Sequence, residues 1–236
     1  MRCLPALLVG VLLLVMLPRK MTEFRLAIYI MLFVLLRDAM TPLGMWRLGS
    51  AGGFWLRLSE SPVMLIGVGA MAAGLVLLTN FFEPELARVL VWRRGSWLSV
   101  ILIGFAGAIV IAAPMFAIYA RVPIAQRGGH VSHSFWPALF AFCLLGNFYE
   151  ESLFRGYFQG LVNKYRGPVR AALLSGIMFS FGHIFLATTV TNTGYAVLLF
   201  TLYEGVIAGI VRMKSGLWAA TIAHGMGIFL ISSGLF

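Results

Sequence analysis

Five polar side chains with the chemistry of a hydrolytic site stand in stretches of sequence that are otherwise almost uniformly apolar. Glu150 and Glu151 are adjacent, Arg155 follows in the same stretch, and His183 and His224 each lie in an apolar segment of their own. An ionised group in the centre of a bilayer is costly and is retained mainly where it functions. Carboxylates and imidazoles exchange protons with water, and arginine holds a negative charge, so the set favours hydrolysis.

Spacing along the chain assigns a partner to one of the two acids. Glu151 and Arg155 are four residues apart, which pairs an acid and a base on one helix face, and such pairing makes a buried charge tolerable. Glu150 then points about 100° away and stays free to act. Phe179 and His183 have the same four-residue spacing, which places a ring beside an imidazole. Each group alone could be a structural ion pair or a hydrogen-bonded core residue, but the five together favour one site.

The composition is that of an integral membrane protein. Of 236 residues, 61% are hydrophobic and 11% are charged, more apolar than a soluble domain of this length can bury. The 26 glycines suit close helix approach in lipid. We assign the net charge of +10 to short loops that set orientation and meet lipid headgroups, and expect no nucleic-acid partner. Cys3 and Cys143 lie in apolar stretches, so we expect buried thiols and no disulfide or cysteine-ligated metal.

Runs long enough to cross the hydrocarbon core predict an all-α fold, a single domain over 1–236 with about eight transmembrane helices. The predicted segments are 4–17, 24–36, 62–82, 97–120, 135–160, 170–187, 194–211 and 217–235. Segment 4–17 resembles a secretory signal but lacks small residues at its end, so we interpret it as a retained anchor. We expect residues 38–61 to form a longer loop that includes an interfacial amphipathic segment around 45–58.

Basic residues are distributed unequally between the two sides of this predicted bundle. Six lie on one side: Arg2, Arg37, Arg47, Arg57, Arg121 and Arg127. Eleven lie on the other: Arg19, Lys20, Arg25, Arg88, Arg93, Arg94, Lys164, Arg166, Arg170, Arg212 and Lys214. The richer side is expected to be cytoplasmic, which places both termini outside the cytoplasm.

The same segments place the polar groups at a common depth. We multiply the rise per residue of an α-helix by the number of residues from the cytoplasmic end of each segment. Glu150 and His183 then lie about 20 Å from the cytoplasmic boundary, and His224 lies about 15 Å from it. All three therefore share a layer near the middle of the membrane. This coincidence predicts a single site.

Three motifs resemble a known family. EESLFR (150–155), FSFGH (179–183) and the helix of His224 are similar to the motifs of the CAAX-processing and bacteriocin-processing (CPBP, or Abi) intramembrane peptidases, relatives of the type II prenyl-protein endopeptidases. The resemblance covers about 140–236, and residues 1–135 match only membrane helices in general. It implies an intramembrane endopeptidase, a CAAX-type glutamic protease, in the bacterial inner (cell) membrane.

The resemblance also implies roles. Glu150 becomes the general base that activates water, assisted by His183, while Arg155 orients or neutralises the acidic pair and His224 stabilises the oxyanion. The implied substrate is a membrane-anchored protein or peptide. Prenylated tails, bacteriocin precursors and C-terminal sorting anchors all remain open.

One position departs from the family pattern. Where the family usually has Asn, four residues after the last histidine, this chain has Ile228. Either another residue supplies the second oxyanion donor, with Asn147 and Ser232 as candidates, or the chain is a catalytically weakened membrane scaffold or immunity-type partner. Glu204 is a further intramembrane acid, interpreted either as a helix-to-helix hydrogen bond or as a third carboxylate at the site.

Two other chemistries were weighed against this one. Glu150, His183 and His224 have the ligand types of a hydrolytic zinc site, but no HExxH pair occurs, so a metal-free mechanism without cofactors is favoured. A proton-coupled carrier would also place acids, arginine and histidine at mid-membrane. No inverted repeat or paired broken helices support that alternative.

Overall fold

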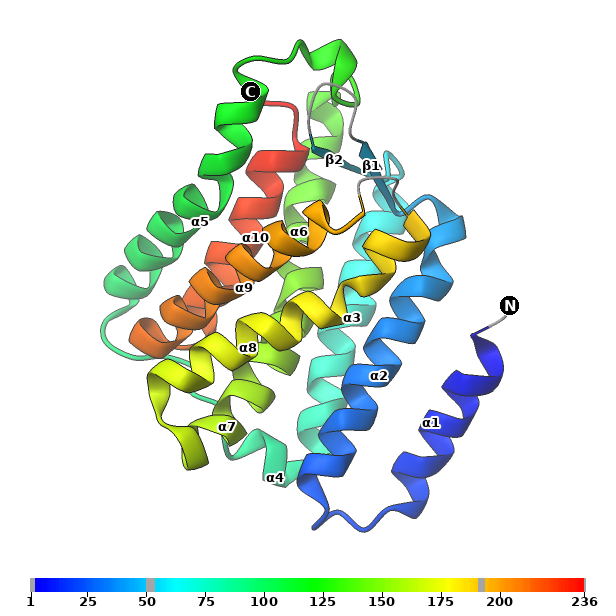
Figure 1. Ribbon diagram of the computed structural model, residues 1–236, viewed down its shortest axis with the longest axis vertical. Coiled ribbons are helices and arrows are strands. Elements are labelled where there is room, and N and C mark those ends of the chain that lie inside the picture. Colours follow the sequence, from blue (N-terminus) through cyan, green and yellow to red (C-terminus); the bar gives the residue numbers. More distant parts are fainter. Residues whose placement is uncertain (1–2, 50–53, 191–193, 236) are drawn as a thin grey trace.

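The structure, a computed structural model, describes residues 3–49, 54–190 and 194–235, and within them helices predominate (Figure 1). Each of the eight predicted segments is helical, which confirms the all-α membrane bundle. The main helices are α1 (Leu4–Met16), α2 (Thr22–Met40), α3 (Pro62–Phe82), α4 (Pro84–Ala87), α5 (Trp97–Tyr119), α6 (Trp136–Glu151), α7 (Gln159–Arg166), α8 (Pro168–Gly182), α9 (Ala196–Ser215) and α10 (Leu217–Ser232). Short 3₁₀ helices occupy Thr41–Leu43, Ile124–Gln126 and His133–Phe135.

Local chemistry sets several helix starts. Ser61 and Ser96 each accept a hydrogen bond from the backbone three residues on, capping α3 and α5. Pro168 takes the first turn of α8, where its missing N–H costs nothing. Between α9 and α10 the chain turns at Gly216, whose φ of 88° favours glycine.

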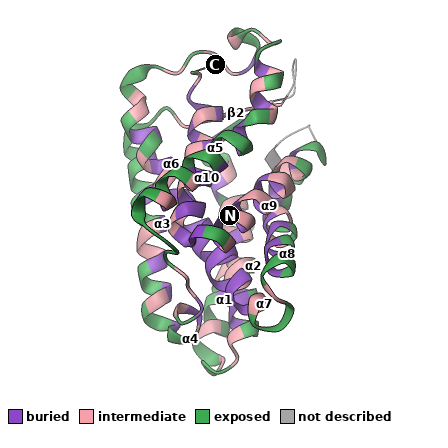
Figure 2. Cartoon of the chain, turned by 90° about the vertical axis from the view of Figure 1, so that its left-hand side faces the viewer, coloured by how far each residue is buried: buried purple, intermediate pink, exposed green. Residues whose placement is uncertain are grey.

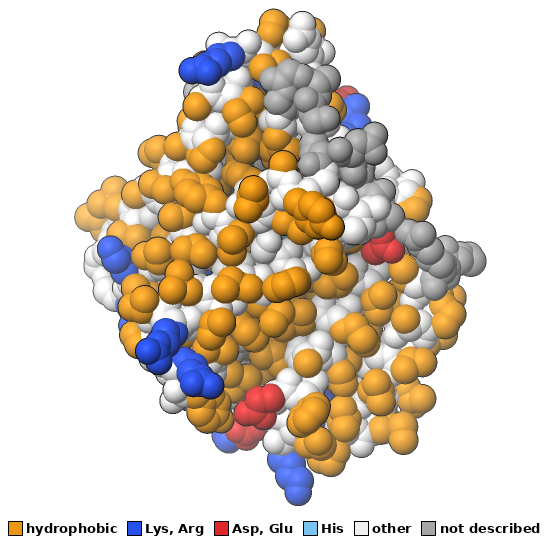
Figure 3. Space-filling view, in the orientation of Figure 1, with side chains coloured by type: hydrophobic (Ala, Val, Ile, Leu, Met, Phe, Trp, Pro, Cys, Tyr) orange, Lys and Arg blue, Asp and Glu red, His pale blue; other side chains and the backbone are white. Residues whose placement is uncertain are grey.

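The bundle has the surface of a membrane protein. In the described part of the chain, five helical segments are long and apolar enough to cross a membrane, and α1 and α10 are shorter apolar helices. Buried residues concentrate inside the bundle, while the outer helices carry exposed side chains (Figure 2). Hydrophobic side chains cover most of the face in Figure 3, and Lys and Arg lie mainly along its edges, at the lower left, at the bottom and near the top. Such an apolar exterior matches lipid.

Residues 38–61 differ from the predicted loop. Strand β1 (Trp46–Gly49) pairs antiparallel with β2 (Trp55–Leu58), and Trp46 stands opposite Leu58. Residues 50–53, which fall within the predicted amphipathic piece, lie outside the described residues. Trp46 and Leu58 are buried and pack in one cluster with Phe142 of α6. The amphipathic segment is therefore a short hairpin packed into the fold, and β2 buries both Leu58 and its neighbour Arg57, which point to opposite faces.

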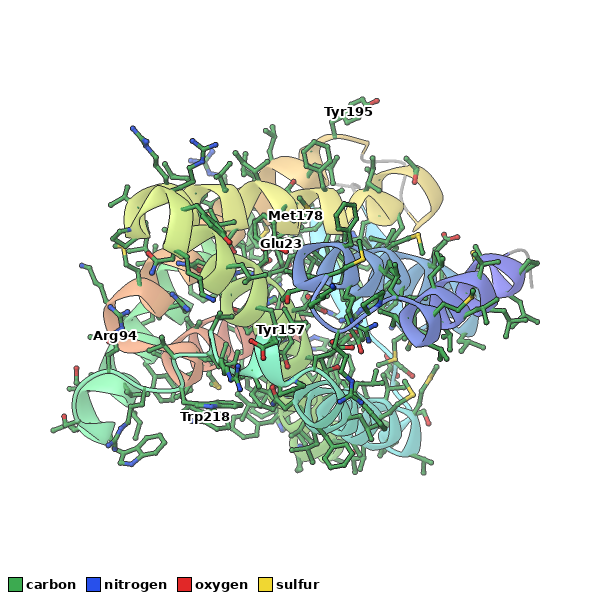
Figure 4. The ribbon with its side chains drawn as sticks, turned by 90° about the horizontal axis from the view of Figure 1, so that it is seen from below. Glu23, Arg94, Tyr157, Met178, Tyr195 and Trp218 are labelled. Carbon is green, nitrogen blue, oxygen red and sulfur yellow. The ribbon has the colours of Figure 1, made fainter. Side chains whose placement is uncertain are left out.

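Predicted segment 135–160 is divided by a π-helix, Ser152–Phe158, which joins α6 to α7. Insertions of this kind often mark functional positions. Seen from below in Figure 4, Tyr157 of the π segment lies within the bundle, and its hydroxyl donates to Asn80 Oδ1 at 2.9 Å. The π segment begins directly after Glu151, so the backbone hydrogen-bond pattern of the helix changes at the acidic pair.

Close backbone approaches bring the site helices together. A Cβ added to Gly205 of α9 would lie 3.0 Å from Gly176 Cα of α8, and one on Gly225 of α10 would lie 2.7 Å from the Cys143 carbonyl of α6. Glycine at these positions allows α8 to lie against α9 and α10 against α6. Helices α8 and α9 cross the front of the bundle side by side in Figure 1.

The turns that carry most Lys and Arg lie towards the lower end of Figure 1, and the hairpin and the C-terminus lie at the upper end. Among the described residues, five arginines assigned to loops are instead buried or partly buried: Arg25, Arg37, Arg57, Arg127 and Arg212. Arg2 is outside the described residues. Arg25 pairs with Glu83, Arg57 donates to the Gly129 and Ile231 carbonyls, and Arg37 lies within α2. These three charges serve the interior of the fold.

Candidate active site

Side chains from four helices and the π segment meet inside the bundle. Glu150 and Glu151 end α6, Arg155 lies in the π segment, and His183 directly follows α8. Glu204 and His224 come from the middle of α9 and α10. All six are buried, with residue exposures of 8% or less. The structure therefore brings together the five groups first singled out in the sequence and adds Glu204.

Each carboxylate oxygen of Glu150 has a partner. Oε2 lies 3.3 Å from Nε2 of His183, and Oε1 forms an ion pair with Arg37. His183 Nδ1 lies 2.8 Å from the Phe179 carbonyl, which can only accept, so Nδ1 carries the proton. In the neutral ring Nε2 is then free to accept a proton. Glu150 and His183 thus form a pair that can share a proton with each other or with a water.

Glu151 is held by the predicted pair and by a second group. Arg155 Nη1 lies 3.1 Å from Glu151 Oε1, and His224 Nδ1 lies 2.9 Å from the same oxygen. Both Glu151 and Arg155 have 0% exposure. The contact with His224 joins α10 to the end of α6. The ion pair with Arg155 offsets the buried charge of Glu151, which would be strongly destabilising without a partner.

Glu204 faces the other side of His224. Its Oε1 lies 3.3 Å from His224 Nε2, so carboxylates stand at both ring nitrogens. Three carboxylates, those of Glu150, Glu151 and Glu204, face two guanidinium groups, those of Arg37 and Arg155. An imidazole donates from one ring nitrogen when neutral and from both when protonated, so His224 can donate to either carboxylate. Glu204 thus contacts the neighbouring helix α10 and also lines the cavity, so both interpretations of this acid stay open.

Phe179 supports both histidines. Its ring centroid lies 4.3 Å from that of His183 and 5.3 Å from that of His224. The Arg155 guanidinium carbon lies 4.0 Å from the same ring centroid. A fully buried aromatic ring with imidazoles and a cation around it restricts their orientations. Phe179 therefore acts as a support for the polar groups.

A cavity of about 100 Å³ adjoins these groups. Glu150, His183, Glu204 and His224 line it on one side, together with Arg37 and Thr201, and Ile228 and Asn147 line it as well. Apolar residues of the hairpin region, of α6, of the segment after α8 and of α9 form the rest: Trp46, Leu48, Phe54, Leu56, Leu58, Phe142, Phe185, Leu186, Val197 and Phe200. A polar corner in an apolar cavity is typical of a site that orients a hydrophobic ligand for reaction.

The two candidate substitutes for the missing Asn each donate a hydrogen bond to a backbone carbonyl. Asn147 Nδ2 donates to the Cys143 carbonyl at 2.6 Å, and Ser232 Oγ donates to the Ile228 carbonyl at 2.7 Å. Both are bonds to the preceding turn of their own helix. Ser232 is not among the residues that line the cavity.

Sequence reasoning missed Arg37, Thr201 and the hairpin wall. Arg37 ends an apolar run and was assigned to a loop, because an arginine near a predicted helix end usually is a flanking charge. The helix instead continues to Met40. The sequence did contain a signal, because Arg37 follows Phe33 by four residues, a spacing that brings two side chains together on one helix face. In the structure the guanidinium carbon of Arg37 lies 5.3 Å from the centroid of the Phe33 ring.

The residues considered for zinc contact other side chains of the site. Glu150 is paired with Arg37, and both nitrogens of His224 face carboxylates. Within the described residues, no group of three or more His, Cys, Asp or Glu side chains is arranged to hold a metal ion. Shared protons and ion pairs therefore account for the contacts of these side chains.

Residues 132–229 match the family model described as type II CAAX prenyl endopeptidase Rce1-like. This segment runs from the approach to α6 into α10 and contains both glutamates of the pair, Arg155, His183, Glu204 and His224. It confirms the resemblance given by the three motifs. No curated protein and no solved structure matches this chain.

Proposed function

Because residues 132–229 form a type II CAAX prenyl endopeptidase Rce1-like domain in a polytopic membrane bundle, we propose that the chain is an intramembrane endopeptidase with a glutamate-activated water and no metal. The family implies a protease integral to the membrane. The observation that carries the mechanism is the Glu150–His183 pair, buried and on the wall of an apolar cavity.

In the proposed reaction Glu150 takes a proton from water, and the water oxygen forms a bond to the carbonyl carbon of the peptide. The carbonyl π electrons move to its oxygen, which becomes an oxyanion. On collapse the C=O bond re-forms, the C–N bond breaks, and the proton on Glu150 passes to the leaving nitrogen. Once Glu150 is protonated, it can donate a hydrogen bond to His183 Nε2, which lies 3.3 Å away and so shares the proton.

The remaining polar groups hold charge in place during these steps. His224, on the cavity wall between two carboxylates, supplies a donor to the oxyanion. Arg155 neutralises Glu151 and fixes the helix end that carries Glu150. The apolar hairpin and the connection between α8 and α9 would keep bulk water from the reacting bond.

We propose a membrane-anchored protein or peptide as the substrate. We place the enzyme in a bacterial inner membrane with both of its termini outside the cytoplasm. The apolar lining of the cavity and the outward apolar surface support a substrate that arrives within the bilayer. The unequal distribution of lysine and arginine supports the orientation.

One observation favours a second candidate, a weakened scaffold that binds without cleaving. Ile228, on the cavity wall, offers no donor where the family usually has Asn. The experiment that separates the two uses protein reconstituted in liposomes with two fluorogenic substrates, a farnesylated peptide ending in a CAAX sequence and a peptide with a C-terminal transmembrane anchor. An intramembrane endopeptidase cleaves at least one of them and loses this activity in Glu150→Gln. A scaffold cleaves neither.

A further inference from the structure

The proposed hydrolysis leaves one role unfilled. An oxyanion in a desolvated site is stabilised by preorganised donors, and each donor is worth about 10²–10³ in kcat. His224 is one donor, but its Nε2 is shared with Glu204. Asn147 uses one of its two amide N–H donors on the Cys143 carbonyl, Ser232 uses its hydroxyl donor on the Ile228 carbonyl, and Ile228 has no side-chain donor. A guanidinium on the cavity wall would offer more donors than the one remaining N–H of Asn147.

Arg37 meets the requirements. It lines the same cavity as Glu150, His183 and Ile228, and the other arginine of the site, Arg155, does not line it. Its side chain is 15% exposed, so the guanidinium is largely removed from solvent. Guanidinium has five N–H donors. In the described part of the chain Arg37 has one ion pair, to Glu150, and two ring contacts, so most of its donors are uncommitted.

The position of Arg37 is fixed by aromatic side chains. Its guanidinium carbon lies 5.3 Å from the ring centroid of Phe33 on its own helix and 5.3 Å from that of Trp46 on the hairpin. Cation–π contacts of this kind hold a guanidinium plane without using its N–H groups. The hairpin thereby aligns a cation from α2 with the acid at the end of α6.

We propose that Arg37 is the second oxyanion donor and takes the place of the Asn that Ile228 replaces. This inference rests on the proposed endopeptidase function and assigns a catalytic residue outside the segment 132–229 that matches the family. The reaction moves one negative charge from Glu150 to the carbonyl oxygen. Arg37 pairs with Glu150 before the step, and the proposal requires that its interaction with the developing oxyanion be stronger than this pairing, because only such a difference raises kcat.

The test measures kcat and KM of liposome-reconstituted protein with the farnesylated CAAX peptide and the anchored peptide. Arg37→Met is expected to lower kcat by about 10²–10³-fold with KM little changed. Arg37→Lys keeps a charge for Glu150 but lacks the planar fork of donors, so it should fold normally and still lose at least about tenfold in kcat. Arg47→Met is the matched control, because Arg47 pairs with Glu60 on the exposed hairpin edge, and it should retain wild-type kcat.

The deciding measurement is rescue. Adding Ile228→Asn to Arg37→Met or to Arg37→Lys should raise kcat at least about tenfold over the single variant, because the amide restores a donor to the oxyanion. A role confined to neutralising or orienting Glu150 predicts no rescue, since an amide at 228 supplies no charge to the carboxylate. No rescue in the folded Lys background, or wild-type kcat in either single variant, overturns the inference and leaves the endopeptidase standing. Absence of Glu150-dependent cleavage in the wild type refutes both.

Discussion

Nδ1 of His224 lies 2.9 Å from Oε1 of Glu151, a contact between residues 73 positions apart that joins α10 to the end of α6. The same oxygen lies 3.1 Å from Arg155 Nη1. Glu151 therefore holds two cationic or proton-bearing groups at once, while its neighbour Glu150 faces the cavity with a separate pair of partners, His183 and Arg37. Two adjacent acids thus have different roles because the helix turns them to different surroundings.

Arg155→Leu is expected to destabilise the protein strongly, by about 3–5 kcal/mol, because it leaves Glu151 as an unpaired buried charge. Chemical denaturation in mixed micelles measures this. The exposed pair of Arg88 with Glu85 provides the matched control, and Arg88→Leu should cost only about 0–1 kcal/mol. The double change Glu151→Leu with Arg155→Leu should be more stable than Arg155→Leu alone. If it is not, the buried pair does not have the assigned role.

Chelators are expected to leave cleavage unchanged, because the contacts of Glu150, His183 and His224 are ion pairs and shared protons within the protein. The measurement is activity of purified protein before and after treatment with EDTA and phenanthroline, with metal content determined in parallel. Stoichiometric zinc, with activity lost on its removal and restored on its return, would overturn the metal-free mechanism.

Ile228→Asn alone is expected to leave kcat unchanged or raise it modestly, since Arg37 and His224 already serve the oxyanion. His224→Ala should remove activity, because the ring lies on the cavity wall and holds Glu151 and Glu204 in place. Steady-state kinetics on both variants check this. A gain of tenfold or more from Ile228→Asn, about 1.4 kcal/mol of transition-state stabilisation, would show a catalytically weakened natural protein and favour the scaffold.

The sequence was sufficient for features that depend on local spacing or on hydrophobicity. Eight apolar runs became helices, Glu151 and Arg155 paired at four residues apart, and the groups at equal depth converged. Contacts between helices were harder to foresee, because these helices are apolar on most sides and periodicity does not show which face meets which neighbour. The partnership of Glu204 with His224 depends on that rotation.

Arg37 and the hairpin were missed for related physical reasons. A helix that ends in arginine is usually flanked by lipid headgroups, so composition favours a loop charge over a site residue. Each strand of the hairpin has only four residues, which is a weak sequence signal. The burial of Trp46 and Leu58 depends on their packing with Phe142 of α6, a contact between distant parts of the sequence. The first 131 residues lie outside the family match but supply Arg37 and much of the cavity wall.

The most direct test of the central claim is the activity of Glu150→Gln in liposomes, measured against wild type and against Glu60→Gln, which changes an exposed acid of the hairpin region. The amide keeps the shape of the side chain but cannot take a proton from water, so cleavage should be abolished while the protein stays folded and membrane-inserted. Glu60→Gln should cleave at the wild-type rate. Activity of Glu150→Gln within a few-fold of wild type would contradict the assignment of Glu150 as the base.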